Sequence, residues 1–141
     1  MAKIITADDF SGQKLIYRQH AYHSSSSEAY FYMSGFTTTS NYPYLTFPMT
    51  FNGKLTKVNL KNNAYSSYSS GPTGSWVKWR VFRNGAYSYV DTYNYTAGTP
   101  GELANFEFSN ATFSAGDDLK FSLQSDGFWR YVTVMMEFET T

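Results

Sequence analysis

Residues 113–139 have the sequence FSAGDDLKFSLQSDGFWRYVTVMMEFE, in which apolar side chains recur at every second position. Within 119–123, Leu, Phe and Leu alternate with Lys and Ser, and within 132–138, Val, Val, Met and Phe alternate with Thr, Met and Glu. A period of two is typical of β-strands that bury one face. The AGDD sequence at 115–118 turns the chain into the first of these strands, and Asp126-Gly127 opens the last strand. The segment therefore predicts two strands.

The same alternation occurs along the rest of the chain, and no window of about 11 residues shows the 3.6-residue spacing of an amphipathic helix. The further predicted strands are residues 14–22, 30–36, 45–51, 55–60, 77–81, 86–90 and 104–108. About nine short strands at this spacing indicate a sandwich or a barrel.

Turn residues lie between the predicted strands. Asn84-Gly85 supplies the positive φ angles that a two-residue hairpin turn requires, and Asn52-Gly53 separates two further strands. Pro43 and Pro48 predict that their strand lies on a sheet edge or carries a bulge. The Ser-, Gly- and Pro-rich loops are residues 24–27, 66–75 and 97–101. The chain shows no internal boundary and no repeat, so we expect a single domain.

The composition limits the function classes. The chain has 141 residues, of which 42% are hydrophobic and only 16% charged, with Tyr and Phe unusually frequent. The formal net charge is zero, which argues against a nucleic-acid binder. The chain has no cysteine, which excludes disulfides, thiolate metal sites and Cys nucleophiles. The first ten residues, MAKIITADDF, lack the apolar run of a secretory signal, and no apolar run could span a bilayer. We expect a soluble protein that does not associate with membranes.

Two segments resemble small jelly-roll virion proteins of tailed bacteriophages, especially marine and cyanobacterial phages, which are similar to the TNF/C1q-like sandwich. The first pattern, P-x-x-x-NG-x-L-x-K-V, is matched by Pro48, Asn52, Gly53, Leu55, Lys57 and Val58. The second pattern, F-x-AGD-x-L-x-F-x-L, is matched by Phe113, Ala115, Gly116, Asp117, Leu119, Phe121 and Leu123. The resemblance covers about the C-terminal two-thirds of the chain. It implies an antiparallel jelly-roll β-sandwich and a virion role as a head decoration or cement protein, or as the head of a fibre, commonly trimeric.

Aromatic residues are the strongest candidates for a binding surface. The segment 64–76 mixes Tyr with Ser and Gly, a composition that favours adaptable recognition. A second group shares one parity along the following predicted strand and would line one sheet face. The candidate interface residues are Tyr65, Tyr68, Trp76, Tyr87, Tyr89, Tyr93 and Tyr95. They could form a subunit interface, a platform for sugar stacking, or an ordinary half-buried layer.

Metal binding has weaker support. His20 and His23 are three residues apart on a predicted strand, so their side chains would point to opposite faces and would not converge on a metal. Asp117 and Asp118 lie in a turn, where Asp is favoured because its side chain bonds nearby backbone N–H groups. We therefore predict no metal site and no cofactor.

Catalysis and nucleic-acid binding are also weakly supported. No G-x-S-x-G elbow and no phosphate-binding Gly-rich loop is present. Glu107 and Glu137 are the strand acids that a glycosidase could use, but the sequence gives no reason to pair them. Lys78, Arg80 and Arg83 near Trp76 could form a basic aromatic strip for single-stranded nucleic acid. The zero net charge argues against this, and outward Lys and Arg are usual on exposed strands, where they hinder aggregation. We predict a non-enzymatic protein.

The sequence hypothesis is therefore a single β-sandwich domain at 13–141, preceded by an N-terminal attachment arm at 1–12. We expect a capsid decoration or cement protein, synthesised in the host bacterial cytoplasm and incorporated into the virion. It would act as a homotrimer that staples neighbouring capsid or fibre proteins. The alternative is a carbohydrate- or host-receptor-binding head of a phage fibre or tail, with a host glycan as ligand.

Overall fold

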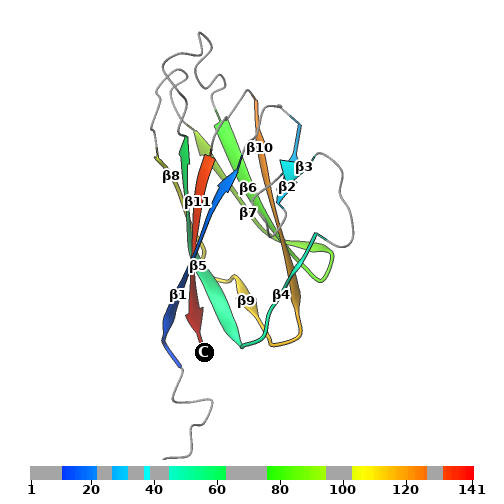
Figure 1. The fold of residues 1–141 in the computed structure, drawn as a ribbon, viewed down its shortest axis with the longest axis vertical. Helices are drawn as coiled ribbons and strands as arrows, with labels where there is room; N and C mark the ends of the chain where they lie inside the picture. Colours follow the sequence, from blue (N-terminus) through cyan, green and yellow to red (C-terminus); the bar gives the residue numbers. More distant parts are fainter. Residues whose placement is uncertain are drawn as a thin grey trace, which may run out of the picture.

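The computed structural model describes residues 11–21, 27–31, 37–38, 45–62, 76–94, 103–126 and 132–141. These residues form antiparallel strands arranged in two sheets that pack face to face (Figure 1). The predicted all-β class and the β-sandwich are confirmed, while the jelly-roll connectivity stays a prediction. No helix able to cross a membrane occurs in the part of the chain that is described.

The first sheet contains the N-terminal and C-terminal strands side by side. Its order is β1 (Lys14–Ala21), β11 (Val132–Thr140), β5 (Gly53–Asn62) and β8 (Leu103–Glu107), and β9 (Thr112–Phe113) pairs with the start of β5. Because β11 pairs with β1 on one side and with β5 on the other, it lies inside the sheet, and among the described strands β1 lies at the edge.

The second sheet is built around β10 (Asp118–Ser125). Its order is β3 (Thr37–Thr38), β2 (Ala29–Phe31), β10, β6 (Trp76–Arg83) and β7 (Ala86–Asn94). The short strand β4 (Phe47–Pro48) pairs with β10 alone, so the edge position predicted for Pro48 is confirmed. A longer strand was predicted here, over residues 45–51, but in the structure β4 is only two residues long.

The core lies between the two sheets and follows the predicted alternation. The first sheet contributes the buried β11 residues Val132, Val134, Met136 and Phe138. The second sheet contributes Trp79, which is fully buried. The Trp79 ring stacks on the Phe121 ring at a centroid distance of 5.9 Å, and its centroid lies 5.2 Å from that of Phe31. The indole N–H of Trp79 has no hydrogen-bond partner within the described residues.

Two of the predicted turns have the geometry that their residues favour. Asn84 and Gly85 join β6 to β7 with φ angles of 51° and 83°, which confirms the two-residue hairpin. The Asp117 carboxylate accepts hydrogen bonds from the Ser114 backbone N–H at 2.8 Å and from the Asn84 side-chain amide at 2.9 Å. These two bonds, the backbone one first, lower the pKa of Asp117. The structural interpretation of the AGDD turn is therefore confirmed.

Gly53 is required for a different reason. It begins β5 in an ordinary strand conformation, and a Cβ atom there would lie 2.7 Å from the backbone oxygen of Glu139. Asn52 lies beside it, and its side-chain oxygen accepts a hydrogen bond from the backbone N–H of Ala115 at 2.9 Å. The Asn52-Gly53 pair therefore marks the point where the chain passes from the second sheet to the first, and close packing requires the glycine.

Candidate functional site

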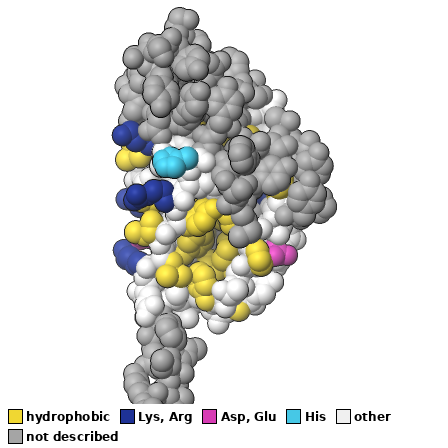
Figure 2. Space-filling model, in the orientation of Figure 1, with side chains coloured by type: hydrophobic (Ala, Val, Ile, Leu, Met, Phe, Trp, Pro, Cys, Tyr) yellow, Lys and Arg dark blue, Asp and Glu magenta, His cyan; other side chains and the backbone are white. Residues whose placement is uncertain are grey.

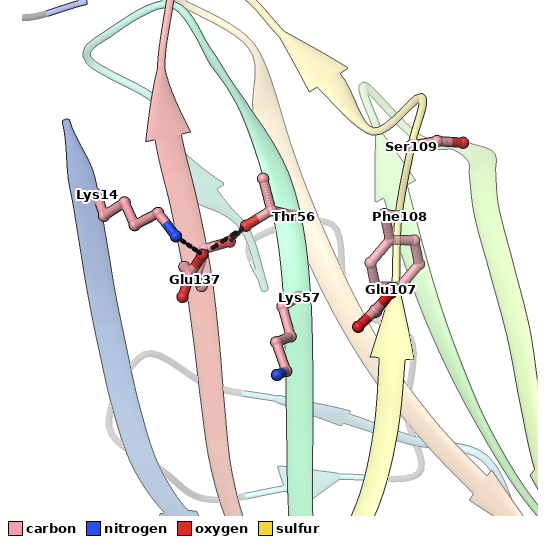
Figure 3. Close-up of a pocket in the computed structure, with 7 residues that line it drawn as sticks. All are labelled: Lys14, Thr56, Lys57, Glu107, Phe108, Ser109 and Glu137. Carbon is pink, nitrogen blue, oxygen red and sulfur yellow. Dashed lines mark hydrogen bonds and ion pairs between the residues drawn. The ribbon is translucent and has the colours of Figure 1, made fainter. Parts of the chain in front are cut away.

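A polar groove lies on the outer face of the first sheet. We call it the charged groove; it has a volume of about 500 Å³ and is shown in Figure 3. Its lining residues are Lys14, Thr56, Lys57, Glu107, Phe108, Ser109 and Glu137. Strand register explains the arrangement, because Glu137 of β11 lies opposite Lys57 of β5, which lies opposite Glu107 of β8. The two acids that the sequence did not pair therefore occupy one row, with a lysine between them.

A β-bulge places two consecutive residues of β5 in this groove. Glu137 pairs with Lys57 whereas Phe138 pairs with Leu55, so Thr56 is an extra residue in β5. Leu55 and Val58 on either side are buried in the core, while Thr56 and Lys57 both line the groove. A bulge redirects side chains in this way, and alternation alone could not have predicted it.

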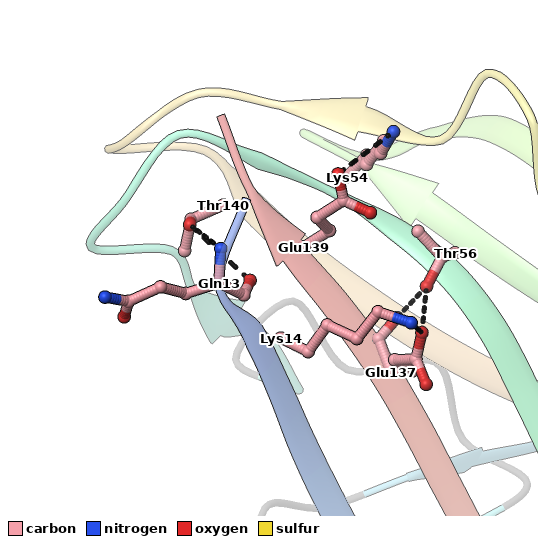
Figure 4. A network of polar contacts seen from close by, with 7 residues as sticks. All are labelled: Gln13, Lys14, Lys54, Thr56, Glu137, Glu139 and Thr140. Carbon is pink, nitrogen blue, oxygen red and sulfur yellow. Dashed lines mark hydrogen bonds and ion pairs between the residues drawn. The ribbon is translucent and has the colours of Figure 1, made fainter. Parts of the chain in front are cut away.

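Glu137 is held by a network of polar contacts (Figure 4). The Lys14 ammonium lies 3.1 Å from one carboxylate oxygen, and the Thr56 hydroxyl donates to the same oxygen at 3.2 Å. The hydrogen bond from Lys14 is the largest cause of a lowered pKa at Glu137, and Thr56 and Lys57 act in the same direction. The lowered pKa favours the ionised form of the carboxylate, which acts as a hydrogen-bond acceptor.

An apolar groove lies at the edge of the sandwich, between β1 and the segment that follows β4. We call it the apolar groove; its volume is about 260 Å³. It is lined by Leu15, Ile16, Tyr17, Phe47, Met49, Phe51, Met136 and Phe138. Figure 2 shows it as a hollowed hydrophobic patch bordered on one side by basic side chains. Leu15 and Ile16 are 41% and 60% exposed, which is unusual for aliphatic side chains on a strand.

Both walls of the apolar groove are fixed by the fold. On β1, Leu15 and Tyr17 lie opposite the buried residues Phe138 and Met136 of β11. On the other wall, Met49 exchanges backbone hydrogen bonds with the 115–118 turn, donating to Asp117 at 2.8 Å and accepting from Gly116 at 2.7 Å. The Tyr17 ring meets the Phe47 ring edge to face at 5.8 Å. The groove is therefore a feature of packed strands and a bonded turn.

The sequence carries one signal for the apolar groove, the consecutive residues Leu15 and Ile16. Leu15 and Ile16 are consecutive, so on a strand one of them must point away from the core while the other points toward it. Met49 and Phe51 were predicted as strand residues, and they instead follow β4 as half-buried groove walls.

The predicted aromatic surface is only partly described. Tyr65, Tyr68 and Tyr95 lie outside the described residues. Trp76 is half-buried at the start of β6, where its backbone N–H donates to the Asp126 carboxylate at 3.0 Å. The Lys78 ammonium lies 5.8 Å from the centroid of the Trp76 ring. Trp76 lines neither groove.

The remaining tyrosine positions lie on β7. Tyr89 and Tyr93 of β7 pair with Val81 and Val77 of β6, two residues that are buried in the core. Tyr87 pairs with Phe82 across a β-bulge. The side chains of Tyr87, Tyr89 and Tyr93 lie outside what the structure describes, so the row that parity predicts for them stays a prediction. An interface role for the tyrosines stays a prediction.

The other candidate side chains have structural partners. His20 lies 3.0 Å from the Thr133 hydroxyl, and His23 lies outside the described residues. Arg80 pairs with Glu28 at 2.7 Å, and Arg83 donates to the Thr112 carbonyl at 2.9 Å. Within the described part of the chain, no group of three or more His, Cys, Asp or Glu could hold a metal ion.

The chain matches no protein-family model, no curated protein and no solved structure.

Proposed function

We propose that the chain is a non-enzymatic structural protein of a tailed-phage virion, of the capsid decoration or cement type. Its copies associate through the apolar groove, and the assembled unit staples neighbouring capsid subunits. The observation that carries this proposal is the groove itself, because it exposes Leu15 and Ile16 beside a sheet edge. The resemblance of residues 47–60 and 113–125 to phage jelly-roll proteins supports the virion setting.

The chemistry of the apolar groove favours a protein partner. Eight apolar or aromatic side chains line it, and its volume of about 260 Å³ is smaller than the roughly 300–1,000 Å³ of ordinary small-molecule sites. Exposed apolar surface at a sheet edge favours an added strand or an inserted side chain, because both bury apolar area. An added strand also forms hydrogen bonds with the backbone groups of the edge.

The virion proposal is tested with heads of the encoding phage that are assembled without this protein. Purified chain is added to the heads, and the fraction that sediments with them is measured together with the protein content of wild-type virions by mass spectrometry. We expect saturable co-sedimentation and a fixed number of copies in each virion. A chain that is absent from virions and stays in the supernatant would overturn the proposal.

The second candidate function is glycan binding by a fibre or tail head, which the charged groove favours. Its open volume of about 500 Å³ and its Lys, Glu, Thr and Ser side chains suit a ligand rich in hydroxyl groups. A titration of the chain with host polysaccharide, followed by Trp fluorescence and by chemical shifts of groove residues, tests this function. Glu107→Gln is expected to weaken such binding, whereas Lys61→Met, outside the groove on the same sheet, serves as the matched control. Unchanged spectra at millimolar sugar would contradict it.

A further inference from the structure

The chain enters the sandwich beside the apolar groove. The backbone N–H of Gly12 donates to the Thr140 carbonyl at 2.7 Å, and the Thr140 N–H donates to the Gln13 carbonyl at 2.9 Å. These bonds hold the chain against β11 as far as Gly12. β1 then contributes Leu15, Ile16 and Tyr17 to the groove within the next few residues. Residues 1–10 are thus joined to the domain next to the groove and lie outside the described residues.

We propose that the apolar groove receives residues 1–10 of a neighbouring copy, which add to the edge strand β1. This inference rests on the proposed assembly function and names the occupant of its contact. Arms passed from one copy to the next form a heterologous contact, which gives a closed ring when the rotation between copies closes, as it would in the trimer expected from the sequence resemblance.

The sequence of this segment complements the groove. MAKIITADDF carries Ile4 and Ile5, and in a strand added beside β1 one of the two would face the apolar groove, whose volume is about 260 Å³. It also carries Asp8 and Asp9, whereas residues 11–21 contain Lys14 and Arg18 and no acidic residue. Lys14 already pairs with Glu137 at 3.1 Å, whereas the exposed Arg18 contacts the Met135 sulfur at 3.8 Å. A carboxylate of the arm would therefore bring opposite charge to Arg18.

The small exposed area argues against a flat contact between two sandwiches. A stable interface buries roughly 800 Å² on each partner, and the only aliphatic side chains that the groove exposes strongly are Leu15 and Ile16. An inserted strand gains backbone hydrogen bonds in addition to apolar burial, so a narrow groove is sufficient for it.

Strand register favours the arm of a neighbour over the arm of the same copy. A two-residue turn at 11–12 would place Asp8 opposite Leu15, and the groove side of β1 would then face a carboxylate. Burying a carboxylate against apolar side chains is costly, and the same register would place Ile5 opposite Arg18. An arm from another copy is free of that turn and can align one of its two isoleucines with the groove. Ile5 lies six residues before Ser11, so an extended arm can place it roughly 20 Å from its own sandwich.

The absence of cysteine in the sequence allows a direct test by cross-linking. Two full-length variants, Ile5→Cys and Met49→Cys, carry tags of different mass, are co-expressed, and are treated with a short bis-maleimide. We expect a heterodimeric product that contains both tags. The matched control pairs Ile5→Cys with Leu103→Cys and should yield little product. Leu103 is exposed on the edge strand β8 of the same sheet. Cross-linking confined to one chain in the double variant Ile5→Cys/Met49→Cys would overturn the exchange.

Absolute mass by light scattering tests the same inference without cysteine. We expect the wild-type chain to have the mass of a trimer, near three times 16.1 kDa. The full-length Ile4→Ser/Ile5→Ser variant is expected to have the mass of a monomer, near 16.1 kDa, and an unchanged circular dichroism spectrum. Ile16→Thr should weaken association about tenfold, whereas Leu103→Thr should not. A trimer that keeps its mass in the Ile4→Ser/Ile5→Ser variant would overturn the arm inference while leaving virion incorporation as the test of the function. A cross-linked trimer that never enters virions would refute the function and leave the arm contact standing.

Discussion

The outer faces of the two sheets differ in their exposure to water, although both have the alternating pattern of half-buried strands. On the first sheet the outward residues are exposed or half-exposed, and the Lys14 side chain is 64% exposed. On the second sheet, two outward residues in the middle of β10 are buried: Lys120 is 9% exposed and Ser122 is inaccessible. A side chain that points away from the core is therefore not necessarily in contact with water.

This difference explains how the polar groups of each face are satisfied. On the second sheet, the Glu28 carboxylate accepts from Arg80 at 2.7 Å and from the Ser122 hydroxyl at 2.5 Å, forming a partly buried cluster. Buried polar groups require partners because water cannot solvate them. On the first sheet, Lys54 and Glu139 lie 3.5 Å apart with about a third of each side chain exposed, so water shares in their solvation.

The largest expected effect is the removal of an outward aromatic ring from the second sheet. Phe82 is 4% exposed and forms a small cluster with Tyr30 and Leu45, with the Tyr30 ring 6.0 Å away. Phe82→Ala should lower the free energy of unfolding by about 3–5 kcal/mol. Leu103→Ala on the first sheet, where Leu103 is 52% exposed, should cost less than about 1 kcal/mol. Urea unfolding of both variants measures the difference, and equal costs would show that the two faces are alike.

The strands and the hairpin could be predicted from the sequence, but the difference in burial between the two outer faces could not. Alternation located most of the strands, and Asn84-Gly85 gave the hairpin, because both are local properties of the chain. Lys120 and Ser122 have the same local pattern as Lys57 and Asn59, and local pattern could not show that only the first pair is buried.

The candidate site was less predictable than the fold. The charged groove depends on the register of three strands and on the bulge at Thr56, which bring together residues distant in sequence. Glu107 and Glu137 were recognisable as strand acids, but nothing local could align them across Lys57. The apolar groove likewise depends on the turn at 115–118 holding Met49 beside β1.

The next largest effect concerns the two ion pairs compared above. Glu28→Gln leaves the Arg80 guanidinium without its carboxylate at a site where only 19% of the Arg80 side chain is exposed. We expect a loss of about 2–3 kcal/mol in the free energy of unfolding, because an ionic hydrogen bond is lost in a partly desolvated place. Glu139→Gln, the matched change in the exposed pair with Lys54, should cost less than about 1 kcal/mol. A cost for Glu139→Gln as large as that for Glu28→Gln would contradict the proposed difference in solvation.

A smaller effect, with a pH signature, is expected at Lys120. Burial lowers the pKa of its ammonium group below the ordinary value for lysine of about 10.5. Between the lowered value and about 10.5, the unfolded chain binds more protons than the folded chain, so the Lys120 contribution to stability rises with pH in that window. The unfolding free energy of the wild type minus that of Lys120→Met should therefore increase toward alkaline pH. A difference that stays constant from neutral pH to about 10.5 would show that Lys120 is solvated like an ordinary surface lysine.

The smallest effect is expected at the pair of Lys14 and Glu137 in the charged groove. The hydrogen bond from Lys14, with smaller contributions from Thr56 and Lys57, lowers the folded-state pKa of Glu137. The resulting stabilisation is fully present above the ordinary Glu pKa of about 4.3 and is lost as pH falls through the lowered folded value. A double-mutant cycle with Lys14→Met and Glu137→Gln should give a coupling below about 1 kcal/mol at neutral pH. That coupling should shrink at high salt, because water and ions reach both side chains. A coupling that equals the cost of Glu28→Gln and persists at high salt would mean that the charged groove excludes water, and the outer face of the first sheet would then resemble that of the second.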